Sequence, residues 1–236
     1  MSEPNFWAVI PAAGLGRRMG GERPKQYLEL EGRPVIDHAV ERMLLHPRLD
    51  GLVIALRDDD AWWAGTEFAD HPDLARVAGG AERCDSVLNA LEQLARRAHA
   101  EDWVLVHDAA RPCVRRDDIT RLVDCLRDDP VGGLLGVPVH DTIKRVGADG
   151  RVGSTVPREA LWRAFTPQMF RLGMLREALR AALAAGVAVT DEASAMEWAG
   201  HAPRMVEGHA DNIKITRAGD LDLAAFLLSK QGGRFY

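Results

Sequence analysis

The first candidate for chemistry is the glycine-rich segment PAAGLGRRMGGERPKQY at residues 11–27. Arg17, Arg18, Arg23 and Lys25 fall within nine residues of it. A glycine-rich backbone and cationic side chains can together wrap a triphosphate and stabilise the negative charge that builds on a departing pyrophosphate. The segment therefore predicts chemistry on a nucleotide, and a surface turn with solvated basic residues is the simpler alternative.

Two familiar nucleotide-binding motifs do not fit this segment. A dinucleotide fingerprint GxGxxG needs its third glycine where the chain has Met19, and Gly20 comes one residue late. The Walker A pattern GxxxxGK[ST] is absent. The strand that should end the first half of a dinucleotide site is followed by Arg57 and not by an acidic residue, which counts against a dinucleotide-dependent oxidoreductase.

Two further charged residues lie at the end of, or within, a predicted strand. Asp108 comes directly after a buried strand, in HDAARP, where a carboxylate facing nucleotide phosphates can hold Mg²⁺. A helix cap or an ion pair with Arg111 would explain Asp108 equally well. Lys214, in DNIKIT, is predicted to point opposite to Ile213 and Ile215, either into water or toward an anion.

The elements that must position these residues alternate between strand and helix. Strands are predicted at residues 6–10, 51–56, 102–112 and 132–139, and helices at 35–46, 85–98 and 117–129. This alternation predicts an α/β fold with a mostly parallel twisted sheet flanked by helices, resembling a Rossmann fold. Ligands of such sheets bind beyond the carboxyl ends of the strands, so the loops at 11–25 and 107–116 should share one rim.

The remainder of the chain departs from this alternation. DTIKRV and RVGSTV flank GADG, which predicts a hairpin within residues 140–157 that reaches over a substrate or a second subunit. Two helices, a short strand and a closing helix should follow, at 171–185, 191–200, 212–216 and 218–230. No linker or repeat interrupts the chain, so we expect a single domain over 1–236 with a β-arm inserted at about 139–158.

Composition narrows the class of protein. The net charge of −5 argues against a nucleic-acid or membrane-surface binder, because phosphate-rich partners need a basic excess. The three cysteines have no CxxC spacing and fit reduced thiols. The N-terminal residues have neither a basic segment nor a long apolar run, so we expect a cytoplasmic protein without a signal peptide or a membrane span.

Seven segments in order resemble the bacterial 2-C-methyl-D-erythritol 4-phosphate cytidylyltransferase family. They are PAAGLGRRMGGERPKQYLELEGRPVIDHAVE, GGAERCDSVLNAL, WVLVHDAARPCV, DTIKRV, FTPQMF, VTDEASAMEWAG and VEGHADNIKIT. The resemblance covers residues 6 to 228. It implies a fold of the nucleotide-diphospho-sugar transferase type, a β-arm that swaps across a homodimer, and a cytidylyl transfer from CTP to methylerythritol phosphate with Mg²⁺, in the non-mevalonate isoprenoid route.

The resemblance also implies roles for the positions that match. CTP would be bound by Ala12, Ala13, Gly14, Gly80, Ala81 and Ser86. The transition state would be stabilised by Arg18 and Lys25, and the nucleophile would be held by Arg158 and Lys214. The acceptor would be bound by Asp108, Ala109, Arg111, Thr142, Arg158, Thr166, Thr190 and Lys214, with Asp108 also the metal ligand. Relatives with an acidic residue at position 81 differ from this chain, in which only the backbone of Ala81 can read the pyrimidine edge.

Two rivals remain beside this family. A ribitol 5-phosphate cytidylyltransferase would share the nucleotide chemistry and differ in the acceptor pocket. A non-catalytic nucleotide-binding regulator would not require Arg18, Lys25 and Asp108 together.

Overall fold

The computed structural model describes residues 3–14 and 23–232, and a seven-stranded sheet runs through its middle. The strand order is β11–β7–β10–β6–β1–β4–β5. The strands are β1 (Phe6–Pro11), β4 (Gly51–Leu56), β5 (Leu74–Ala78), β6 (Trp103–Val106), β7 (Gly132–Pro138), β10 (Trp162–Arg171) and β11 (Arg204–Glu207). Only β10 runs antiparallel to its neighbours β6 and β7, so the mostly parallel sheet is confirmed.

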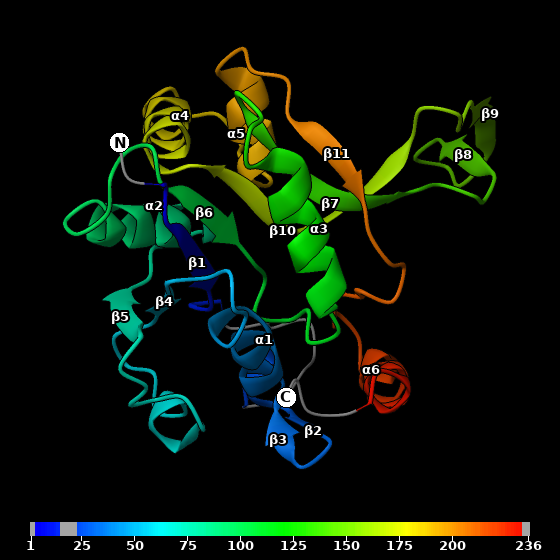
Figure 1. Ribbon diagram of the computed structural model, residues 1–236. Coiled ribbons are helices and arrows are strands. Elements are labelled where there is room, and N and C mark those ends of the chain that lie inside the picture. The colour runs from blue at the N-terminus through cyan, green and yellow to red at the C-terminus, as the bar shows by residue number, and fades with distance from the viewer. Residues whose placement is uncertain (1–2, 15–22, 233–236) are drawn as a thin grey trace.

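Helices cover both faces of this sheet (Figure 1). They are α1 (Val35–Leu44), α2 (Arg83–Leu94), α3 (Arg116–Leu126), α4 (Leu172–Ala184) and α5 (Glu192–Trp198). The last helix, α6 (Gly219–Lys230), packs instead in a small cluster with Leu30, Val35 and Ile215. Side chains of a strand alternate between faces, so Ala8 and Ile10 of β1 pack with α1 and α3, while Val9 packs with α2, α4 and α5. Both faces of the central strands are therefore buried, as their continuous apolar runs predict.

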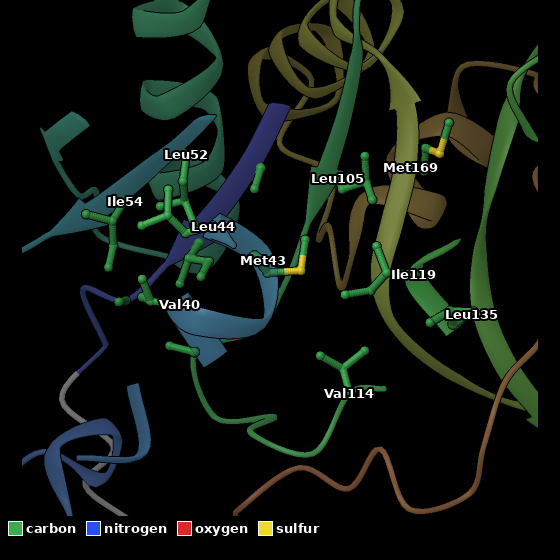
Figure 2. Close-up of a cluster of buried hydrophobic side chains, with 14 of the residues drawn as sticks. Val40, Met43, Leu44, Leu52, Ile54, Leu105, Val114, Ile119, Leu135 and Met169 are labelled. Carbon is green, nitrogen blue, oxygen red and sulfur yellow. The ribbon is translucent and has the colours of Figure 1, made fainter. Parts of the chain in front are cut away.

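Figure 2 shows part of the apolar cluster that contains Ala8 and Ile10. In it, Met43 and Leu44 of α1 lie with Leu52, Leu105 and other strand residues. All of the labelled side chains are at most 7% exposed. Their burial fixes β1 and β6 at the middle of the sheet, and the loops that follow these two strands are the ones that carry the candidate site.

Smaller elements lie outside the sheet. The hairpin β8 (Ile143–Val146) and β9 (Val152–Val156) is hydrogen-bonded only within itself and projects away from the remainder of the chain (Figure 1). It lies at the residues predicted to form a hairpin. Two short strands, β2 (Glu29–Leu30) and β3 (Arg33–Pro34), and two 3-10 turns, η2 (Lys25–Tyr27) and η3 (Trp63–Gly65), complete the elements of the described ranges.

The strand predicted at residues 212–216 is wrong. This segment joins no strand ladder, and separate bonds hold it instead. Ile215 N donates to the carbonyl of Ala110, Arg111 Nη1 donates to the carbonyl of Asn212, and Asn212 Nδ2 donates to that of Thr166. The expected directions of the side chains nevertheless hold, because Ile215 packs in a small cluster under α6 while Lys214 faces Asp108.

No helix in the described residues is long and apolar enough to cross a membrane.

Candidate active site

A cavity of about 290 Å³ opens at the carboxyl ends of β1 and β6. The rim predicted for the loops after these strands therefore exists. Ten of the residues singled out in the sequence line it: Ala12, Ala13, Gly14, Lys25, Gly80, Ala81, Ser86, Asp108, Ala109 and Lys214. Arg18 lies outside the described residues.

The loop after β1 is held from within the chain by a buried amide. Gln26 Nε2 donates to the carbonyls of Ala12 and Gly14, at 2.9 and 3.0 Å, so η2 fixes the path of the backbone. The same turn places Lys25, whose Nζ donates to the carbonyl of Ile215 at 2.9 Å. Gln26 was not singled out from the sequence, although Gln26 directly follows Lys25 in PKQY.

The loop between β5 and α2 packs closely against the first. A Cβ on Gly79 would lie 2.2 Å from the Cβ of Ala13, so only glycine allows this approach. Gly80 N donates to Ser86 Oγ at 3.0 Å, and Ser86 Oγ donates to the carbonyl of Glu82. The two loops thus form one wall of the cavity, and several of its backbone groups are held by bonds within the chain.

Asp108 is surrounded by cations. Its carboxylate lies 2.8 Å from Lys214 Nζ, 3.0 Å from Arg83 Nε and 3.5 Å from Arg111 Nε. Burial raises the pKa of Asp108, but the charges of Arg83 and Lys214 outweigh it and hold that pKa far below its ordinary value. Asp108 is therefore ionised throughout the physiological range and is a poor base.

Beneath Asp108, the buried residues His107 and Thr166 form a fixed hydrogen-bond relay. His107 Nε2 lies 3.0 Å from the carbonyl of Arg111 and donates to it, so Nδ1 accepts from Thr166 Oγ1. Thr166 Oγ1 in turn accepts the N–H of Asp108 at 3.1 Å. Burial lowers the pKa of His107 to about 4 and keeps the ring neutral. Thr166 is only 4% exposed, so in the protein without substrates its hydroxyl group positions Asp108.

Three predicted acceptor residues lie away from this cavity. Thr142 and Arg158 are exposed at the base of the hairpin, where Arg158 Nη1 donates to the carbonyl of His140. Thr190 is exposed just before α5. None of the three lines the cavity within the described part of the chain. Arg111, which is 9% exposed, does not line the cavity either, but its Nε lies 3.5 Å from the carboxylate of Asp108.

Arg83 and Glu192 are site residues that sequence reasoning did not single out. Arg83 lines the cavity, bonds Asp108, and makes a two-pronged pair with Glu192, with distances of 2.6 and 3.1 Å. Glu192 is fully buried. A glutamate directly after a capping Asp191 resembles ordinary first-turn charge, and no sequence signal separates the two cases.

Among residues 3–14 and 23–232, no group of three or more His, Cys, Asp or Glu side chains could hold a metal ion. Mg²⁺ is commonly bound by only one or two carboxylates together with substrate phosphates. Asp108 therefore fits an ion that arrives with a nucleotide, not one caged by the protein alone.

Comparison with known proteins places this geometry in a family. The family described as IspD, 2-C-methyl-D-erythritol 4-phosphate cytidylyltransferase, matches residues 6–230. The enzyme of that name from Pseudomonas entomophila is 58% identical over 220 residues, which is 93% of this chain and 94% of that protein. The Pseudomonas aeruginosa PAO1 enzyme is 59% identical over 92% of this chain and 94% of its own length.

Solved structures agree with the sequence match. The Francisella tularensis 2-C-methyl-D-erythritol 4-phosphate cytidylyltransferase superposes with a TM-score of 0.81 at 37% identity, over 95% of this chain and all of that one. The Thermus thermophilus enzyme gives 0.74 at 31% identity, over 94% of this chain and 98% of that one. The chain belongs to the 2-C-methyl-D-erythritol 4-phosphate cytidylyltransferase family.

Proposed function

We infer that this protein transfers the cytidylyl group of CTP to 2-C-methyl-D-erythritol 4-phosphate, giving 4-diphosphocytidyl-2-C-methyl-D-erythritol and pyrophosphate. The observation that carries the inference is the family match over nearly the whole chain, joined to a cavity with Lys25, Lys214 and Asp108 on one rim. The reaction belongs to the non-mevalonate route to isoprenoid precursors. The family match does not favour the ribitol 5-phosphate alternative.

The chemistry asks the protein mainly for positioning. The attacking group is a phosphate oxyanion, which needs no strong base, and the low pKa of Asp108 agrees with this. The task is to hold two polyanions in line and to stabilise charge on the α-phosphate and on pyrophosphate. We assign Lys25 to the triphosphate and Lys214 to the acceptor phosphate, and Arg18 is proposed to share the role of Lys25.

Nucleotide selection is assigned to the wall formed by the two packed loops. The backbone of Ala12, Ala13 and Gly14 would meet the nucleotide, while Gly80, Ala81 and Ser86 would meet the cytosine. Main-chain N–H and C=O groups can read a pyrimidine edge without an acidic side chain at Ala81. The close contact between Gly79 and Ala13 supports this assignment, because it fixes the distance between the two loops.

A divalent cation, proposed to be Mg²⁺, would be held by Asp108 together with the phosphates of CTP. When bound, it offsets negative charge on those phosphates. Ala109, Arg111, Thr166 and Thr190 are proposed to complete the acceptor side.

The hairpin β8–β9 is proposed to be an arm that reaches a second subunit of a homodimer. Its support is the projection of the hairpin and the exposure of Val146 and Val152, at 52% and 61%. Arg158 and Thr142, at its base, lie away from the cavity of their own chain and would serve the cavity of the partner subunit.

The test is a pyrophosphate-release assay in which each of CTP, UTP, ATP and GTP is combined with methylerythritol phosphate or ribitol 5-phosphate. We expect release only with CTP and methylerythritol phosphate, with other pairs at least about tenfold slower. Equal or faster turnover of ribitol 5-phosphate would assign the acceptor differently. An absence of release with every pair would overturn the enzymatic function.

A further inference from the structure

Arg83 joins two carboxylates that come from different parts of the chain. Its Nε donates to Asp108 at 3.0 Å, while Nη1 and Nη2 donate to the two oxygens of Glu192 at 2.6 and 3.1 Å. Each of the three guanidinium nitrogens is thus engaged, and the planar fork is oriented by Glu192. Arg83 stands at the first position of α2, where a cation is disfavoured by the helix dipole, so it needs these anions.

Glu192 is itself rigidly placed. It is fully buried at the first position of α5, next to Asp191, whose side chain accepts the N–H of Ser194 in a capping box. Gln168 of β10 donates to Asp191 and accepts the N–H of Ala193, at 2.9 and 2.8 Å. The start of α5 is therefore tied to the sheet, and Glu192 acts as a fixed anchor for Arg83.

The contacts continue from Arg83 to the reacting side of the cavity. Asp108 takes Arg83 on Oδ1 and Lys214 on Oδ2, so the carboxylate plane is fixed from both sides. Burying a carboxylate costs free energy that only a paired cation offsets, and each charged group in this series of contacts has a partner of opposite charge. The order of contacts is Glu192, Arg83, Asp108, Lys214.

We propose that Glu192 and Arg83 are positioning residues, which hold Asp108 and through it Lys214 where the acceptor phosphate is bound. The proposal rests on the proposed function, since Lys214 is the group that it serves. Arg83 acts through Asp108 and is not a ligand of the triphosphate. Glu192 never meets a substrate, because it has no exposed surface.

The test compares Glu192→Gln with Glu197→Gln, which makes the same chemical change at an exposed position of the same helix. Steady-state kinetics are measured with CTP and methylerythritol phosphate, and thermal unfolding is followed in parallel. We expect Glu192→Gln to lower kcat/KM for the acceptor about 10²-fold, with KM for CTP changed less than about twofold. Glu197→Gln should match the wild type.

A second comparison separates positioning from general support of the fold. If Glu192 acts through Lys214, adding Glu192→Gln to Lys214→Met should lower activity no further than Lys214→Met alone. Arg83→Lys keeps a charge beside Asp108 but cannot grip both carboxylates, and it should reproduce the loss seen with Glu192→Gln. It decides the question if Glu192→Gln does not fold.

Three results would overturn the proposal: Glu192→Gln as active as Glu197→Gln, a rise in KM for CTP as the main effect of Arg83→Lys, or fully additive losses in the double variant. The second result would make Arg83 a nucleotide ligand. A wild-type protein that releases no pyrophosphate is a different outcome, which removes the proposed function and this inference with it.

Discussion

Lys214 Nζ lies 2.8 Å from Oδ2 of Asp108, and this contact joins the end of β6 to the segment after β11. The two charges neutralise each other in the free protein, while Arg83 holds the other carboxylate oxygen. An arriving phosphate or cation must therefore compete for one partner of an existing pair. Substrate binding at Lys214 and Asp108 therefore replaces an existing ion pair with a new one, because neither charge is unpaired beforehand.

Lys214→Met should remove the cation assigned to the acceptor while leaving the fold intact, because the Lys214 side chain is 40% exposed. We expect kcat to fall by about 10²–10³-fold, the usual effect of losing one preorganised donor. Lys230→Met, in the last turn of α6, is the matched control and should leave turnover unchanged. Turnover of Lys214→Met within about threefold of the control would remove Lys214 from the mechanism.

Lys25→Ala should act on the triphosphate side. Lys25 lines the cavity, and its ammonium group donates to the carbonyl of Ile215. We expect kcat to fall by about two to three powers of ten, since charge on the departing pyrophosphate loses a fixed cation. Circular dichroism and thermal unfolding should remain close to those of the wild type. Near-normal turnover would show that Lys25 has no such role.

Shared sites in a dimer can be tested by mixing inactive variants. Arg158→Ala mixed in equal amounts with Lys25→Ala should recover about a quarter of wild-type activity, because half of the dimers are hybrids and each hybrid has one intact site. Lys25 and Lys214 line the same cavity, so mixing Lys25→Ala with Lys214→Met should recover nothing. Equal recovery in both mixtures, or in neither, would contradict a site completed by the arm.

Gly79→Ala should separate the two loops of the nucleotide wall. The added methyl group would lie 2.2 Å from the Cβ of Ala13 and 3.4 Å from the carbonyl of Leu56, so the backbone has to shift. We expect KM for CTP to rise about tenfold or more, since a small misplacement weakens several contacts at once. Gly65→Ala, with open space around its Cβ, is the control. An unchanged KM for CTP would mean that the wall does not bind the nucleotide.

The stability of the protein should depend on the protonation of Asp37. Asp37 is 2% exposed in α1, and burial raises its pKa to about 6. The folded state therefore binds this proton more tightly than the unfolded state, and stability is lost as the pH rises from about 4 to about 6. Asp37→Asn should gain up to about 3 kcal/mol at pH 8 and little at pH 4.

Urea unfolding at these two pH values measures the effect, with the exposed Asp58→Asn as a control for the loss of one negative charge. A gain that is equal at pH 4 and pH 8, or equal in both variants, would show that burial of the Asp37 carboxylate is not its source.

The sheet was predictable wherever a strand is buried on both faces. The range of β4 matches its predicted range, and β1 and β7 lie within one residue of theirs, because their apolar runs are continuous. β6 covers only the first, apolar part of the range predicted for it, 102–112, and the charged remainder of that range is a loop. The helices α1, α2 and α3 follow from their apolar stripes. The cavity residues after β1 and β6 follow from the rule that ligands bind beyond the carboxyl ends of strands.

Edge strands and the antiparallel strand were not predictable in this way. β5 and β11 are short edge strands whose residues are half exposed, so their pattern resembles that of loops. The first three residues of β10 are exposed, and its register shifts between Ala164 and Gln168, which breaks the alternation of its apolar residues. The segment NIKIT has strand-like residues, but long-range side-chain bonds hold it without a ladder.

The ion pairs of the site were beyond prediction for a related reason. Arg83 and Glu192 are far apart in the chain, and each has an ordinary local explanation as a helix-start residue. Only the packing of α2 and α5 on the same face of the sheet brings them together. Pairing between distant charges is a property of the fold, and composition and spacing do not contain it.

Because β1 and β6 lie side by side in the middle of the sheet, the loops of the site begin at strands that have a hydrogen-bonded neighbour on both sides. Hydrogen exchange at Val9 or Leu105 then needs the whole sheet to open, whereas exchange a few residues later needs only the rim to move. Substrate binding can therefore change the conformation of the rim alone. The loops of the site can thus adjust to substrates while the core of the sheet stays folded.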